Sequence, residues 1–292
     1  MKQAHTLFKG LTEMTSVGDD VFLAESDDIG TPNIFGGQAL GQAVSAAYQT
    51  LPAGKRIHSL HAYFLSAGRH QPIRYEVDRL RDGTSYAARR VTARQGESVI
   101  FEAMVSAQEA ESGLEYQVSM PEVPGPEGLQ SEFEYRQSVR DQWPEILHGR
   151  LLAPRGIEYR RVQVQDILHP KPYAGTTHTW LRAMEPLPDT PMAHHAFLAY
   201  ASDHGPLLSA IAPYDLSLVK GEVRLASLDH AIWFHRDFRL DDWLLYEIDC
   251  TNIGGGRALC KGQLYQDGRL VATVAQEGLM RVRRDLDSVH RA

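Results

Sequence analysis

The chain has 292 residues, 43% of them hydrophobic and 23% charged, which is ordinary for a soluble globular protein of roughly two domains. Its net charge of −7 argues against nucleic acid or an anionic membrane as the main partner. The two cysteines, Cys250 and Cys260, are too few for a disulfide framework and indicate a reducing cytoplasm. Neither end of the sequence predicts a signal peptide, a membrane span or a peroxisomal tripeptide.

The first half predicts one central helix. A short strand is expected at 20–26, and residues 35–48 then place small and apolar residues at helical spacing. The helix is apolar enough to be wrapped by other structure rather than to lie on the surface. Gly36, Gly37 and Gly41 would each cost roughly 1 kcal/mol in a helix interior, so we expect them to let another backbone approach closely.

An antiparallel meander follows this helix. Its strand-like runs alternate well, and Asp82-Gly83 and Gln95-Gly96 are turn signals between them. The predicted strands are 57–65, 72–80, 84–95 and 98–108.

A change of composition separates the two halves. Residues 109–130 are acidic and rich in Pro and Gly, which is typical of a linker. A short helix is expected from Ser131, where Glu134 completes a capping-box pattern. The predicted division is an N-terminal domain at 1–110, a linker with a short helix at 111–150 and a C-terminal domain at 151–285.

The second half repeats the order of the first. A helix with Pro at its start is predicted at 191–203, and Asp267-Gly268 supplies a hairpin signal. The two meanders close alike, on Ala107-Gln108-Glu109 and on Ala275-Gln276-Glu277, which indicates an internal duplication. The predicted strands are 156–165, 176–184, 221–235, 242–251, 256–266 and 269–280. The fold class predicted is α+β, a double hot-dog: two tandem hot-dog domains, each with a long helix wrapped by a curved antiparallel β-sheet.

One apolar stretch of the second half also carries many polar groups. Residues 225–236 include a hydroxyl, a carboxylate, two imidazoles and a guanidinium, and the stretch at 57–65 is a weaker echo of it. Because buried polar groups need partners, this stretch predicts a central strand beside a site.

Three residues form the candidate site: Asp203, Ser227 and Gln276. Asp203 ends an apolar helix, where the helix dipole disfavours a carboxylate. Taken singly, each has an ordinary alternative as a loop cap, a core serine or a buried amide. No phosphate-binding loop, Gly-x-Ser-x-Gly elbow, His-Glu-x-x-His motif or Cys/His metal set is present, so neither a metal nor a cofactor is expected.

Several longer motifs carry a resemblance to a known family. They are IFGGQALGQA at 34–43, HSLHAYFL at 58–65, LRDGTSYAARRV at 80–91, YASD at 200–203, LDHAIWFHR at 228–236 and QEGLMR at 276–281. Over nearly its whole length the chain resembles the acyl-CoA thioesterase II family, the tandem hot-dog thioesterases. In that family an Asp, a Thr and a Gln hold the water that attacks the thioester. Asp203 and Gln276 match the Asp and the Gln. Ser227 stands at the Thr position, where it keeps the hydroxyl but has a less restrained rotamer.

This resemblance implies a mechanism. Asp203 is expected to act as general base while Ser227 and Gln276 orient the same water. Backbone N–H groups at Gly37 and Gln38 are expected to meet the developing oxyanion across the pseudo-dimer. His58 could orient the substrate or act as an acid, and its alternative is a core histidine bonded to backbone.

Other polar and aromatic residues have two interpretations each. A relay built from Ser227, Asp229 and His230 is not expected, because Asp229 and His230 are neighbours on a strand and point to opposite faces. Trp233 and Phe234 are expected in the core, with lining of the acyl tunnel as the alternative.

Two neighbouring arginines in the first half also have two interpretations. Arg89 and Arg90 could meet CoA phosphates, but solvated edge-strand arginines are the preferred interpretation.

The function expected is hydrolysis of medium- to long-chain fatty acyl-CoA to free fatty acid and CoA. The alternatives are an acyl-CoA binding or assembly module with an inactive site, and an enoyl-CoA hydratase, although no histidine follows Asp28 closely. The partners expected are acyl-CoA and further copies of this chain in a cytoplasmic homodimer or homotetramer, with no membrane insertion.

Overall fold

The computed structural model describes residues 9–143, 145, 148, 152 and 156–283. The domain limits predicted at 1, 150, 151 and 285 lie outside the described residues. The same holds for residues 1–8 and for the C-terminal tail, where targeting signals were considered.

The first half contains the predicted helix and meander. Its elements are the strands β1 (Thr15–Gly18) and β2 (Val21–Ala24), the helix α2 (Gly36–Tyr48), and the strands β3 (Arg56–Phe64), β4 (Ile73–Asp82), β5 (Tyr86–Gln95) and β6 (Ser98–Gln108). The strand β1 was not predicted, because all four of its residues are exposed and it carries no alternating hydrophobic pattern.

The segment between the halves contains the predicted capped helix, α3 (Glu132–Ser138), and a 3-10 turn at Arg140–Gln142. The capping box is confirmed: the N–H of Glu134 donates to the Ser131 hydroxyl at 3.1 Å, and the N–H of Ser131 donates to the Glu134 carboxylate at 2.9 Å. Before α3, the Gln117 side chain donates to the Gly268 carbonyl at 2.9 Å, so this segment crosses the C-terminal part of the sheet.

The second half repeats the first with two differences. Its elements are β7 (Ile157–Arg161), β8 (Thr177–Ala183), α5 (Pro191–Ser202), α6 (Pro206–Ile211), β9 (Val223–Ser227), β10 (Asp229–Phe234), β11 (Leu244–Gly254), β12 (Arg257–Gln266) and β13 (Arg269–Val282). The short helix α6 follows Gly205 and was not predicted. The prediction of one strand at 221–235 is wrong, because the chain leaves the ladder at Leu228 and forms β9 and β10 separately.

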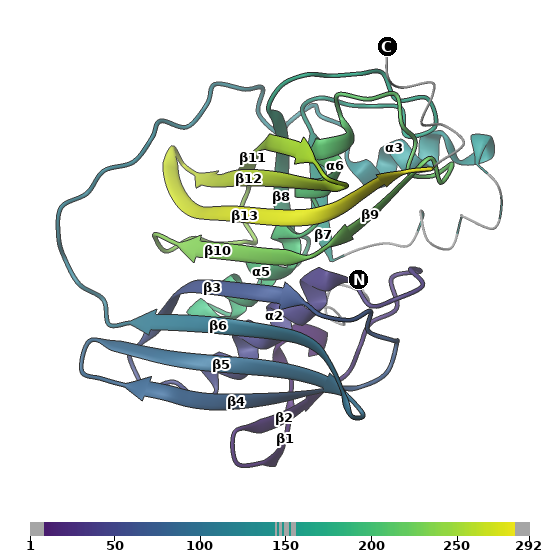
Figure 1. The fold of residues 1–292 in the computed structure, drawn as a ribbon. Helices are drawn as coiled ribbons and strands as arrows, with labels where there is room; N and C mark the ends of the chain where they lie inside the picture. Colours follow the sequence, from purple (N-terminus) through teal and green to yellow (C-terminus); the bar gives the residue numbers. More distant parts are fainter. Residues whose placement is uncertain (1–8, 144, 146–147, 149–151, 153–155, 284–292) are drawn as a thin grey trace.

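Within the described residues the strands form one continuous antiparallel sheet in the order β1-β2-β4-β5-β6-β3-β10-β13-β12-β11-β8-β7, with β9 paired to β13. The two halves join where β3 pairs with β10, with Leu60 opposite Ile232 (Figure 1). The α+β double hot-dog prediction is confirmed. No helix among the described residues is long and apolar enough to cross a membrane.

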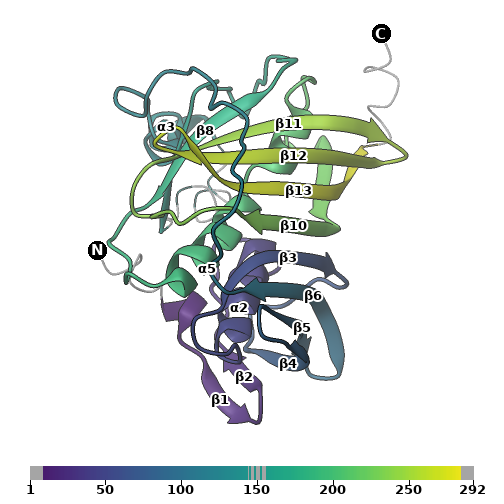
Figure 2. The same ribbon diagram turned by 90° about the vertical axis from the view of Figure 1, so that its left-hand side faces the viewer.

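The two long helices lie side by side on the same face of the sheet (Figure 2). They run antiparallel and approach closely: a Cβ at Gly37 would lie 2.3 Å from the carbonyl oxygen of Tyr200, and a Cβ at Gly41 would lie 2.7 Å from that of Ala196. Any side chain at these positions would push the helices apart, which confirms the role predicted for Gly37 and Gly41. Gly36 instead faces the side chains of Asp203 and Phe64.

This antiparallel packing creates two ends of the helix pair. At the Gly36 end, the N-terminus of α2 faces the C-terminus of α5 at Asp203. At the Tyr48 end, the C-terminus of α2 faces the N-terminal turns of α5 at His195.

Candidate active site

The structure brings Asp203, Ser227 and Gln276 together at the Gly36 end. Asp203 caps α5, Ser227 ends β9, and Gln276 lies within β13. The Ser227 hydroxyl donates to Asp203 Oδ1 at 2.9 Å. The Gln276 amide donates to the same oxygen at 2.8 Å and to the Ser227 hydroxyl at 2.7 Å. Three elements from different parts of the second half therefore converge on one carboxylate oxygen.

The break at Leu228 explains how the strands deliver these groups. The N–H of Leu228 donates to the Glu277 carbonyl at 3.0 Å, and its own carbonyl accepts from the N–H of Phe64 at 2.9 Å. In an unbroken strand, side chains three positions apart lie on opposite faces. Here Ser227 and His230 both reach Gln276, at 2.7 and 2.9 Å. The break therefore adds His230 to the site, which was not predicted.

Among the described residues, no basic side chain contributes to the pKa of the Asp203 carboxylate. Burial raises the pKa of Asp203 to about 6, and hydrogen bonds from Ser227, Gln276 and the backbone N–H of Gly37 oppose that rise. The C-terminus of α5 disfavours a carboxylate, but the N-terminus of α2 faces it with the opposite dipole. Asp203 can therefore hold or release a proton close to neutral pH.

Gly36 allows this carboxylate its position. A Cβ at Gly36 would lie 2.7 Å from Asp203 Oδ2, closer than two such atoms can approach. The glycine pair thus serves both the helix packing at Gly37 and the carboxylate at Gly36.

Two other predicted residues have their polar groups engaged elsewhere. The Gln38 side chain donates to the Glu25 carbonyl and accepts from the N–H of Asp27, both at 3.1 Å. The backbone N–H of Gln38 donates to the Phe35 carbonyl at 3.0 Å. His58 bonds the Ser106 hydroxyl at 2.8 Å and does not line the cavity beside Asp203. The structure brings neither group to the cluster.

A cavity of about 310 Å³ reaches Asp203. Apolar side chains form much of its wall, among them Phe35, Leu207, Leu208, Ile211, Leu218 and Leu225. This is the size and character of a site for a small molecule with a long apolar part.

A cluster of charged residues closes one side of the cavity. The Glu132 carboxylate of α3 bonds Arg161 at 2.6 Å, Arg136 at 2.7 Å and His204 at 3.2 Å. Burial raises the pKa of Glu132, but Arg161, His204 and Arg136 outweigh it and hold that pKa well below its usual value. The ionised Glu132 therefore fastens α3 to the residue that follows Asp203. This cluster was not predicted, and the capping box was the only sequence signal near it.

Comparison with known proteins decides the family. Residues 24–108 match the family described as acyl-CoA thioesterase N-terminal domain, and residues 155–279 match acyl-CoA thioesterase. The chain is 37% identical over 273 residues to acyl-CoA thioesterase 2 of Haemophilus influenzae, covering 93% of this chain and 96% of that protein. The chain belongs to the acyl-CoA thioesterase II family.

Further relatives agree with this assignment. Human acyl-coenzyme A thioesterase 8 is 36% identical over 278 residues, covering 91% of this thioesterase and 86% of that protein. The crystal structure of the acyl-CoA thioesterase II TesB2 from Mycobacterium marinum superposes with a TM-score of 0.77 at 35% identity, covering 95% and 99% of the two chains. By this homology the protein is an acyl-CoA thioester hydrolase with two tandem hot-dog units.

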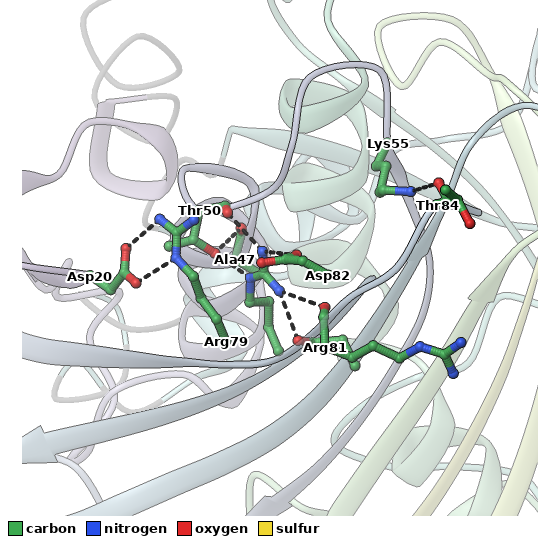
Figure 3. A network of polar contacts seen from close by, with 10 residues as sticks. Asp20, Ala47, Thr50, Lys55, Arg79, Arg81, Asp82 and Thr84 are labelled. Carbon is green, nitrogen blue, oxygen red and sulfur yellow. Dashed lines mark hydrogen bonds and ion pairs between the residues drawn. The ribbon is translucent and has the colours of Figure 1, made fainter. Parts of the chain in front are cut away.

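The prediction of solvated edge-strand arginines is wrong for Arg89 of this thioesterase. The strand β5 lies between β4 and β6, and Arg89 is fully buried. Its guanidinium donates to the Thr50 hydroxyl and carbonyl, both at 2.8 Å, and to Asp82 at 2.7 Å, in the polar network around Thr50 and Asp82 (Figure 3). These bonds also leave Arg89 unavailable to CoA phosphates. Arg90 is exposed and pairs with Asp78 at 2.8 Å.

The aromatic prediction is half right. Phe234 is buried and stacks on His195 with ring centroids 4.1 Å apart. Trp233 is only partly buried, and it contacts His61 edge-to-face at 5.0 Å. Neither aromatic residue lines the cavity.

The structure also bears on two alternative chemistries. Asp229 accepts the N–H of Glu277 at 2.6 Å, and the two ring nitrogens of His230 bond Ser202 and Gln276, so the residues at 227, 229 and 230 form no relay. The hydratase alternative needs a histidine near Asp28, and His70, which is distant in sequence, lies 3.7 Å from it. The Asp28 carboxylate is 64% exposed, however, unlike the buried Asp203. In the described part of the chain, no group of three His, Cys, Asp or Glu residues could hold a metal ion.

Proposed function

We propose that this thioesterase hydrolyses medium- to long-chain fatty acyl-CoA to free fatty acid and CoA by direct attack of water. The observation that carries the proposal is the convergence of Asp203, Ser227 and Gln276 at an apolar cavity. A thioester is an activated acyl group, so one positioned water and one base suffice for its hydrolysis.

In the proposed mechanism, Asp203 removes a proton from the water as its oxygen attacks the thioester carbonyl carbon. Ser227 and Gln276 orient that water. The tetrahedral intermediate expels the CoA thiolate, which takes the proton from Asp203 and leaves as the thiol. The N-terminus of α2 supplies a positive dipole that favours the oxyanion, while the Gly37 N–H itself donates to Asp203. We leave Gln38 out of this role, because its backbone N–H and its side-chain amide are hydrogen-bonded elsewhere.

The preference for medium and long chains rests on the cavity. Its volume lies at the lower end of small-molecule sites, and aliphatic residues such as Leu207 and Leu225 form the wall beside Asp203. Burial of methylene groups there would contribute about 0.8 kcal/mol each, which favours longer acyl groups until the cavity is filled.

Compartment, assembly and domain limits are further parts of the proposal. The two free cysteines support a reducing compartment such as the cytoplasm. The family matches at 24–108 and 155–279 support the division into 1–110, 111–150 and 151–285. We propose a homodimer or homotetramer, and light scattering that finds only a 32.7 kDa species would remove that part.

The experiment is hydrolysis of saturated acyl-CoAs from C4 to C18, with the released thiol read by a chromogenic reagent. Wild type and Asp203→Asn are compared, and binding of each acyl-CoA is measured in parallel. We expect turnover on a contiguous range of medium and long chains, lost in the variant while binding persists. Binding without release by wild type would favour the binding-module alternative. Release that is unchanged in Asp203→Asn would discard Asp203 as the base.

A further inference from the structure

His230 lies fully buried behind the catalytic cluster. It is on β10, one residue before Ala231, which pairs with Ala275 of β13. Its Nδ1 lies 2.9 Å from Gln276 Oε1, and its Nε2 lies 2.9 Å from the Ser202 hydroxyl. Both ring nitrogens are therefore engaged, and one of them bonds a predicted site residue.

These contacts set the direction of the hydrogen bonds that link Asp203, Gln276, His230 and Ser202. The Gln276 NH₂ must face Asp203, because the carboxylate oxygen is an acceptor only. Its carbonyl oxygen then faces His230, so Nδ1 must carry the proton. Burial lowers the pKa of His230 to about 4, so the ring is neutral and has a single N–H. Nε2 is then an acceptor, so the Ser202 hydroxyl must direct its proton to Nε2 at 2.9 Å rather than to its other acceptor, the Ala199 carbonyl at 3.1 Å.

We propose that His230 is a positioning residue: its Nδ1–H holds the Gln276 amide with the NH₂ group toward Asp203, and the Ser202 hydroxyl donates to Nε2 in this tautomer. The inference rests on the proposed roles of Asp203 and Gln276. It assigns His230 no contact with substrate or with the attacking water.

The alternative orientation of Gln276 shows why the amide needs a fixed direction. Rotation by 180° would point its carbonyl oxygen at the Asp203 carboxylate and remove the donors at 2.8 and 2.7 Å. Two acceptors would then face each other. The pKa of Asp203 would rise, because the bond from Gln276 is one of the contacts that lower it.

Other titratable groups also surround Asp203. His204 follows it in the chain and bonds Glu132, which Arg136 and Arg161 also contact. Tyr246 lies on the other side and donates to the Ser202 carbonyl at 3.1 Å. All of these residues remain in the variants below, so a change in the pH profile reports on His230 and Gln276.

The test compares His230→Leu with His230→Asn. Leucine removes the donor, whereas asparagine can place an NH₂ group near the position of Nδ1. We expect His230→Leu to lower kcat by about 10- to 100-fold, less than loss of a donor that touches the reacting atoms. KM should change less than about twofold, and the acidic limb of the kcat/KM profile should move to higher pH. His230→Asn should restore much of kcat and the position of the limb.

A matched control exists at the Tyr48 end. His195 is also buried and bonds a hydroxyl, that of Tyr48, at 2.9 Å. His195→Leu should lower the melting temperature but leave kcat and the pH limb unchanged. If His230→Leu behaves like His195→Leu, His230 has only a structural role and the inference is overturned.

A double-mutant cycle separates this inference from the proposed function. In a Gln276→Leu background, His230→Leu should cause no further loss of kcat, because the amide that His230 positions is gone. Additive losses would overturn the positioning role. Retained turnover in Asp203→Asn together with a non-additive cycle would remove Asp203 as the base but leave His230 as the residue that positions Gln276.

Discussion

The two ends of the helix pair differ in what occupies the space between the helices. At the Gly36 end a residue without a side chain leaves room for the Asp203 carboxylate. At the Tyr48 end the space is filled: the Tyr48 hydroxyl accepts the N–H of Ile57 at 3.1 Å and is hydrogen-bonded to His195 Nδ1 at 2.9 Å. The duplicated fold thus presents one open end and one closed end.

The charges at the two ends differ in the same way. Asp203 is buried with hydrogen-bond donors but forms no direct ion pair with any residue that the structure describes, and burial raises its pKa to about 6. Beyond the Tyr48 end, the buried Arg89 pairs with Asp82 and has all its donors directed at protein acceptors. A buried carboxylate without a cation can exchange a proton near neutral pH. The comparison supports the proposal that chemistry occurs at the Gly36 end and that the Tyr48 end stabilises the fold.

The largest expected effect is the loss of turnover in Asp203→Asn at the Gly36 end, compared with Asp82→Asn near the Tyr48 end. Asp203→Asn should lower kcat by about 10³-fold, because it removes the proposed general base. Asp82→Asn should leave kcat unchanged and lower the free energy of unfolding by about 2 kcal/mol, because Arg89 loses its counter-ion while Asp82 is itself partly exposed. Thiol release and chemical denaturation measure the two quantities. Loss of kcat in Asp82→Asn would contradict the division between the ends.

The glycines of α2 provide a second contrast. Gly36→Ala places a methyl group against the Asp203 carboxylate, and Gly41→Ala places one against the Ala196 carbonyl. Each should lower the free energy of unfolding by about 1–3 kcal/mol through overpacking. Only Gly36→Ala should also lower kcat per folded molecule, by more than about tenfold, since it displaces the base. Equal kcat in the two variants would show that the carboxylate tolerates the displacement.

The pH dependence sharpens the electrostatic part of the comparison. Because ionised Asp203 is the proposed base and its pKa is about 6, kcat/KM should fall about tenfold per pH unit below that value. Ser227→Ala should move this limb to higher pH, since the Ser227 hydrogen bond lowers the pKa of Asp203. A wild-type limb near pH 4, the ordinary range for Asp, would show that burial does not tune the base.

The smallest effect is expected at the closed end. Tyr48→Phe removes the acceptor for Ile57 and the hydrogen bond to His195, and should lower the free energy of unfolding by about 1–2 kcal/mol. Turnover of the folded enzyme should not change. A thermal melt measures the loss of stability, and the acyl-CoA hydrolysis assay measures turnover. An altered preference for acyl-chain length would mean that the Tyr48 end also contacts substrate.

Much of the fold could be predicted because its signals are local. The helix at 36–48, the alternating strands and the capping box at Ser131 follow from periodicity and short motifs. The break at Leu228 could not be predicted, because it depends on pairing with Glu277 and Phe64, which lie far away in sequence. The burial of Arg89 was missed for the same reason, since the sequence does not show that β5 is an inner strand.

The site was predicted in part. The convergence of Asp203, Ser227 and Gln276 agrees with the prediction, while their catalytic roles and that of Gly37 remain proposals. His230 was missed because strand alternation placed it away from Ser227. The Glu132 cluster was missed because ion pairs between a linker helix and a distant strand leave no periodic pattern.

The close approach of α2 and α5 has a consequence for how the enzyme matures. The backbone N–H of Gly37 comes from the first half of the chain and Asp203 from the second, and they meet only once the helices are in contact. During refolding, secondary structure can form within each half, but the base acquires its final surroundings only when this long-range contact closes. Hydrolysis should therefore be among the last signals to recover, and a chain whose halves have not yet associated should leave acyl-CoA intact.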